Sequence, residues 1–190
     1  MTPSHFLSTP ECSRKLAHTR TFVLNAYERE DRLLDLEALI EDIKPEMFLT
    51  QARKFDCGVP IHLMAIRITV NESMDVINAE TSMQRMPFPA ICSDAQPNIR
   101  KLIGTNLLKG FRHEVANRIP ASDRCSHLSE LATLLPTLAI QTLMKKMSIE
   151  ESKGSAMHSK PLKIDGCQAW RSDGPLVMKY YPQWYRQSNK

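Results

Sequence analysis

The stretch PIHLMAIRITV, residues 60–70, decides the fold class. In an extended chain, successive residues lie on opposite sides. One side of this segment carries His62, Met64, Ile66, Ile68 and Val70, and the other carries Arg67 and Thr69. A period of two is typical of a β-strand with one buried face, because successive side chains point to opposite sides of a sheet. We therefore predict a strand over residues 61–70, with the imidazole of His62 on the face that meets the core.

Three further segments are predicted to be extended and to form a meander with this strand. They are residues 18–26, 32–43 and 74–83. Helix is an alternative for residues 33–43, because Glu and Leu are good helix formers. The pattern indicates a mostly antiparallel sheet of four or more strands with one covered face.

The chain changes character after Pro89, and helical patterns replace the strands. We predict helices over residues 93–104, 107–118 and 128–147, with Ser126 as the N-cap of the last one. Pro136 should kink or divide that helix. With the helices packed on one face of the sheet, the fold class is α+β.

The sequence predicts one domain with less ordered connections. Residues 1–17 are expected to be a flexible lead-in and residues 18–147 the α+β core domain. Residues 148–161 are rich in Ser, Lys, Glu and Gly, as a flexible linker would be. We expect residues 162–190 to be a C-terminal β-hairpin and tail of the same domain, turning at Ser172-Asp173-Gly174 and pairing with the main sheet.

Composition excludes some classes of function. The 25 basic and 21 acidic residues are interspersed and give a net charge of +4, which does not favour nucleic-acid binding. No apolar run has the ~18–20 residues of a membrane span, and the N-terminus lacks the apolar stretch of a signal peptide. The five cysteines are odd in number and widely spaced, as expected of reduced thiols, so a cytoplasmic location is predicted.

Four residues are candidates for a site: His62, Cys92, Cys125 and His127. Cys92 and Cys125 each directly precede a predicted helix, and His127 lies in the first turn of the last helix. The positive potential of a helix N-terminus favours thiolate over thiol. Thiolates and neutral imidazoles are the ligands of zinc and of iron–sulfur centres.

These patterns favour zinc or an iron–sulfur species bound at His62, Cys92, Cys125 and His127. Glu130, Asp94 and Cys57 are further candidate ligands. A scaffold, carrier or accessory role is favoured over enzymatic turnover. One alternative is a thiol-dependent enzyme with Cys125 as the nucleophile. Another is a protein-interaction module in which the Cys/His cluster is structural and the aromatic tail binds a protein partner.

The segments Pro60-Ile61-His62-Leu63-Met64 and Cys125-Ser126-His127-Leu128, with Cys92 between them, resemble an uncharacterised bacterial domain family. Members of that family carry His-Asp-Met, Cys-Pro and Cys-Thr-His-Leu at similar spacing, and the resemblance runs from about residue 18 to 185. This chain has Leu63 where Asp is usual and Ser93 where Pro is usual. Leu63 argues against a role for a carboxylate beside His62. The family has no assigned activity, so the resemblance implies no function.

The order of elements also resembles the NifU/IscU iron–sulfur scaffold domain. In that alignment the two later cysteines of the scaffold fall at Cys92 and Cys125, and its aspartate falls at His62. Cys57 lies near the position of the first cysteine, but its distance from Met64 along the chain is too long for a clean match. This resemblance implies a NifU/IscU-like arrangement and an iron–sulfur site.

Overall fold

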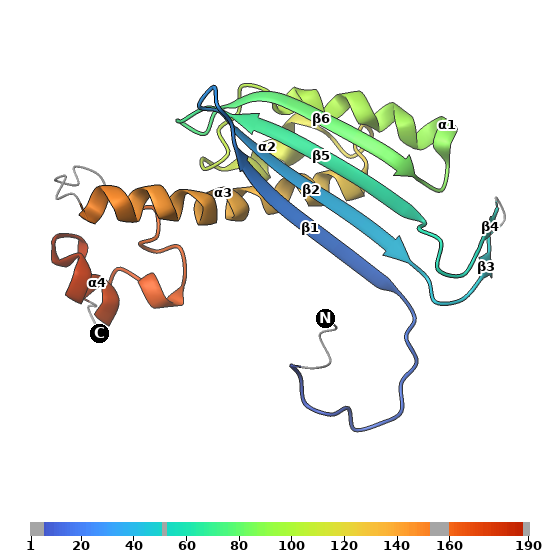
Figure 1. Ribbon diagram of the computed structural model, residues 1–190, viewed down its shortest axis with the longest axis horizontal. Coiled ribbons are helices and arrows are strands. Elements are labelled where there is room, and N and C mark those ends of the chain that lie inside the picture. Colours follow the sequence, from blue (N-terminus) through green and yellow to red (C-terminus); the bar gives the residue numbers. More distant parts are fainter. Residues whose placement is uncertain (1–5, 51–52, 153–159, 188–190) are drawn as a thin grey trace. The chain divides into compact units, whose positions relative to one another are not determined.

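The computed structural model describes residues 6–50, 53–152 and 160–187. Its main sheet has four antiparallel strands in the order β1-β2-β5-β6 (Figure 1). The strands are β1 (Thr19–Glu28), β2 (Leu34–Ile43), β5 (His62–Val70) and β6 (Val76–Arg85). The α+β class and the antiparallel sheet are confirmed, and residues 34–43 form a strand rather than the alternative helix.

One face of this sheet holds the core, because β2 and β5 present apolar side chains at every second position. The buried residues of these two strands include Leu34, Leu36, Ala38, Ile40, Met64, Ile66, Ile68 and Val70. The register places Leu36 opposite Ile68, so the two stripes meet across the strands. The short strands β3 (Phe48–Leu49) and β4 (Lys54–Phe55) pair with each other in the connection between β2 and β5.

Helices cover that face, as predicted, and lie behind the sheet in the view of Figure 1. The predicted helix over residues 93–104 is instead α1 (Pro89–Cys92) followed by a 3₁₀ helix, η2 (Ser93–Leu102). Pro97 lies inside η2 and lacks the N–H that an α-helix would use there. The next helix, α2 (Phe111–Arg118), begins four residues later than predicted, because Gly110 has a left-handed φ of 64°.

The last helix of this layer, α3 (Ser126–Ser152), brings candidate residues to the sheet. The backbone carbonyl of Cys125 accepts a hydrogen bond of 3.0 Å from the N–H of Ser129. Cys125 is therefore the N-cap residue, and the prediction of Ser126 is wrong by one position. The helix is continuous through Pro136, which does not divide it.

The C-terminal region differs from the prediction. Residues 148–152 belong to α3 rather than to a linker, and residues 153–159 of the predicted linker lie outside the described residues. The hairpin is wrong: residues 160–187 form two 3₁₀ helices and α4 (Pro175–Tyr180), with no strand. A turn does occur at 172–174, but Pro175 follows it at the first helical position, where its fixed φ starts a helix.

The apolar side chains of the tail are buried locally rather than by pairing with the main sheet. Ile164, Val177 and Tyr181 form a small cluster, against which Trp170 and Trp184 pack. The chain divides into two compact units, residues 1–139 and 140–190, and the division falls within α3.

None of the helices described has both the length and the apolar character needed to cross a membrane. The cytoplasmic location stays a prediction.

Candidate functional site

A row of three polar residues crosses the sheet at the end of the apolar stripe. Asp42 pairs with Arg20 on β1 and with His62 on β5. Asp42 is next in the alternating series of β2 after Ile40, so its side chain points to the core face. Its carboxylate is 2% exposed, and a charge buried to this extent needs partners.

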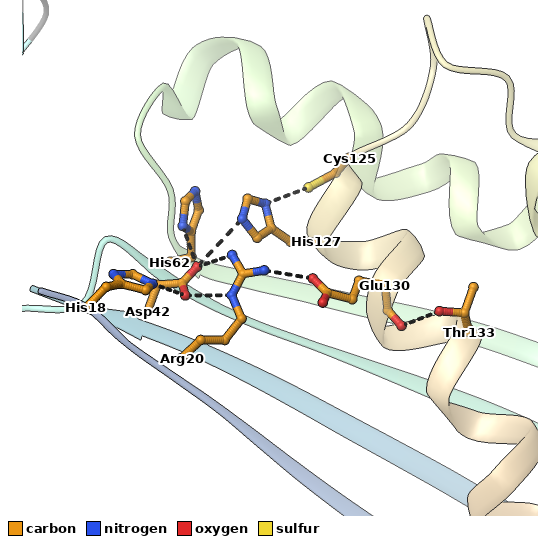
Figure 2. Close-up of polar contacts among 8 residues, drawn as sticks. All are labelled: His18, Arg20, Asp42, His62, Cys125, His127, Glu130 and Thr133. Carbon is orange, nitrogen blue, oxygen red and sulfur yellow. Dashed lines mark hydrogen bonds and ion pairs between the residues drawn. The ribbon is translucent and has the colours of Figure 1, made fainter. Parts of the chain in front are cut away.

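The Asp42 carboxylate has partners on both oxygens (Figure 2). Arg20 donates from Nε to Oδ1 at 2.8 Å and from Nη2 to Oδ2 at 2.9 Å. His18 Nε2 lies 2.9 Å from Oδ1, and His62 Nδ1 lies 2.9 Å from Oδ2. These four hydrogen bonds use the roughly four lone-pair positions that a carboxylate offers.

The first turn of α3 adds a second imidazole to this row. The rings of His62 and His127 lie with centroids 3.8 Å apart, tilted by 31°. His127 Nε2 is 3.6 Å from Oδ2 of Asp42, which is too long for a hydrogen bond. On the other side of the ring, His127 Nδ1 lies 3.8 Å from the sulfur of Cys125 (Figure 2).

Burial and charge set the protonation of these groups. Burial alone would raise the pKa of the Asp42 carboxyl, but hydrogen bonds from Arg20 and His18 hold the pKa well below its usual range. Burial lowers the pKa of His62, and the hydrogen bond to Asp42 only partly opposes it. Burial and the charges of His62 and Arg20 lower the pKa of His127 to about 4. At neutral pH the carboxylate is therefore ionised and both imidazoles are neutral.

The two histidines line a cleft of about 550 Å³ between the start of β5, the α1–η2 segment and the start of α3. All four predicted site residues line it: His62, Cys92, Cys125 and His127. Its other lining residues include Met64, Pro87, Ile91, Asp94, Asn98, Arg124 and Ser126.

Within the described chain, one group of side chains could share a metal ion: Asp42, His62 and His127. One ligand atom from each lies within 4.8 Å of the others. Neither sulfur belongs to this group. We expected Cys92 and Cys125 to converge with His62 at ligand spacing, and they do not. Among the further candidates, Asp94 lines the cleft, whereas Cys57 is exposed and donates to the carbonyl of Pro45.

Glu130, another predicted ligand, has a different partner. It lies one turn after His127 on α3 and accepts a hydrogen bond of 2.8 Å from Arg20 Nη1. Arg20 therefore joins two carboxylates that come from β2 and α3, and Glu130 is not in the metal-capable group.

Sequence reasoning missed Asp42 and His18, and it placed Arg20 on a solvated face, with an ion pair across the first two strands as the alternative. The substitution at Leu63 argued against a carboxylate beside His62, and that expectation is wrong because the neighbouring strand supplies one. A signal for Asp42 was present: an acid that continues an apolar stripe of period two must lie on the buried face. The pairing of Asp42 with His62 and Arg20 follows from strand register, which no spacing within the sequence reveals.

The fold and the site together define an α+β domain in which two histidines line a cleft and lie beside a buried carboxylate. The family described as "Protein of unknown function (DUF2889)" matches residues 18–141, which is more than half of the chain, so the chain belongs to this family. The prediction of an uncharacterised domain family is thereby confirmed. No curated protein and no solved structure matches the chain, so the resemblance to the NifU/IscU scaffold has no support.

Proposed function

We propose that this domain binds one divalent transition-metal ion, zinc by the chemistry of its ligands, through Asp42, His62 and His127. The observation that carries the proposal is the approach of these three ligand atoms to within 4.8 Å of one another. They come from β2, β5 and α3, so the fold itself assembles the group. Imidazole and carboxylate are zinc ligands at about 2.0–2.2 Å.

The protonation of the two histidines supports the same function. A metal ion binds neutral imidazole and has to compete with protons for it. Because the pKa of His127 is lowered to about 4 and that of His62 is lowered as well, both rings are free of the competing proton at neutral pH.

The positions of the thiols favour a single ion over an iron–sulfur species, because a cluster is held mainly by cysteine thiolates. Cys125 lies beside His127 and is a candidate for a fourth ligand. Cys92 lines the same cleft. With His62 and His127 lining a cleft, the domain suits the role of a metal carrier or accessory factor.

The test is zinc binding by protein purified without chelator and freed of any histidine tag. We expect one zinc ion per chain by elemental analysis. His62→Ala and His127→Ala should each weaken binding at least tenfold, as loss of a ligand or its partner does. His113→Ala is the matched control, because His113 is an exposed histidine on α2. Substoichiometric zinc in the wild type, or equal losses in all three variants, would contradict the proposal.

A second candidate function, thiol-dependent catalysis at Cys125, is favoured by the 3.8 Å contact between its sulfur and His127 Nδ1. In such enzymes the imidazole takes the thiol proton. A pKa of about 4 makes His127 a weak base at neutral pH, which is why metal binding ranks first. Alkylation rates test the alternative: an activated Cys125 should react much faster at pH 7 than the exposed Cys12, and equal rates would exclude it.

A further inference from the structure

Arg20 is a strong cation that bonds directly to Asp42 at the proposed metal site. Its guanidinium pairs with Asp42 in parallel geometry, from Nε to Oδ1 and from Nη2 to Oδ2. The Arg20 side chain is 35% exposed, whereas that of Asp42 is 2% exposed. The carboxylate is therefore buried in the interior, whereas the Arg20 side chain is partly open to solvent.

A metal ion at Asp42 has to compete with this guanidinium. The oxygen that lies toward both histidines is Oδ2, at 2.9 Å from His62 Nδ1 and 3.6 Å from His127 Nε2. The same oxygen accepts the hydrogen bond from Arg20 Nη2. Since the lone pairs of the carboxylate are already used, an ion at Oδ2 removes a donor, and two cations at one oxygen repel each other.

A second acceptor for Arg20 is already in place. Nη1 donates to Oε2 of Glu130 at 2.8 Å. Glu130 lies three residues after His127, so the helix that supplies a metal ligand also supplies this carboxylate, on the same side of the helix. The guanidinium can leave Oδ2 without losing all its anionic partners.

We infer that Arg20 is a displaceable competitor that sets the metal affinity of the site. It neutralises Asp42 in the metal-free protein and shifts toward Glu130 when the ion binds. This inference rests on the proposed function, since it assigns the control of the same site. It predicts that removing Arg20 strengthens zinc binding and that removing the charge of Glu130 weakens it. A purely structural arginine would not give this direction of change in zinc affinity.

The experiment compares zinc dissociation constants of full-length wild type, Arg20→Gln and Glu130→Gln, by competition with a chromophoric chelator at pH 7. Arg20→Gln should bind zinc about tenfold more tightly, because one charge-assisted hydrogen bond no longer opposes the ion. Glu130→Gln should bind several-fold more weakly. Arg112→Gln is the matched control: this exposed arginine also bonds to α3, at Thr133 and Thr137, but does not touch Asp42. Its affinity should equal that of the wild type.

The outcomes separate the inference from the proposed function. If the wild type binds zinc and Arg20→Gln binds it equally or more weakly, Asp42 only orients His62 and the inference is overturned while the metal site stands. If neither protein binds zinc, both fall. Zinc binding by Arg20→Gln alone would support the inference about Arg20 and contradict the proposal that the wild-type domain binds zinc. Should Arg20→Gln fail to fold, the same test uses Glu130→Gln and Arg20→Lys, which keeps the charge but loses the parallel pair. Tighter zinc binding by Arg20→Lys and weaker binding by Glu130→Gln support the inference. Weaker binding by Arg20→Lys and tighter binding by Glu130→Gln overturn it.

Discussion

The paired strands β2 and β5 bury side chains on the same face of the sheet at both of their ends. The buried side chains are apolar at one end and polar at the other. At one end Leu36 faces Ile68, and both are fully buried. At the other end Asp42 faces His62, and Asp42 is buried almost as completely. The apolar end requires only volume and shape, so many hydrophobic residues satisfy it. The polar end requires particular donors in particular positions, and it draws them from β1 and α3 as well.

The largest expected effect comes from breaking the polar end. Asp42→Leu should lower the free energy of unfolding by about 3 kcal/mol, although leucine suits a buried position, because Arg20 and His62 lose their acceptor. The double variant Arg20→Met with Asp42→Leu should recover part of the loss, since it removes the unpaired cation. Urea unfolding of Asp42→Leu, of the single variant Arg20→Met and of the double variant measures the three changes in stability. A double variant that costs the sum of the two single changes would show that the pair is not coupled.

The second-largest expected effect is a pH dependence of the free energy of unfolding, which arises from the polar end alone. The pKa of His127 is about 4 in the folded protein, below its ordinary value of 6.5. Between these values the unfolded chain binds the extra proton, so stability is complete above pH 6.5 and is lost as the pH falls toward 4. We expect a decrease of roughly 1–3 kcal/mol across this window.

Denaturation at several pH values in metal-free buffer checks this slope. His127→Gln should reduce this slope, because one of the two imidazoles with a lowered pKa is gone. Leu36→Ala, at the apolar end, should be less stable than the wild type by about 2–5 kcal/mol at every pH while keeping the same slope. An unchanged slope in His127→Gln would assign the pH dependence to other groups.

The smallest expected effect tests whether the apolar end is independent of the site. Ile68→Val should cost about 0.5–1.5 kcal/mol of stability, since it removes one buried methyl group. It should leave the zinc stoichiometry and affinity unchanged, because Ile68 lies at the far end of β5 from His62. A change in zinc affinity as large as that of His127→Ala would mean that the two ends are coupled.

The same contrast explains what the sequence could predict. The strands follow from alternation, which also places His62 on the core face, and the four candidate residues line one cleft. The predicted helix boundaries were wrong near Pro97, which lies inside a 3₁₀ helix, and near Gly110, whose left-handed backbone precedes the start of α2. The prediction of a C-terminal hairpin was wrong because a helix begins at Pro175, where an extended strand was expected. Asp42 and the contacts of Arg20 were missed because they depend on register between strands, which is a property of the folded sheet.

The site is tested most directly by the X-ray absorption spectrum of the zinc-loaded protein at the zinc edge. The account predicts nitrogen and oxygen neighbours at about 2.0–2.2 Å, with the outer-shell scattering of two imidazoles, reduced to one in His127→Gln. A first shell of sulfur at about 2.3 Å, unchanged in His127→Gln, would place the ion on cysteines instead and contradict the assignment to Asp42, His62 and His127.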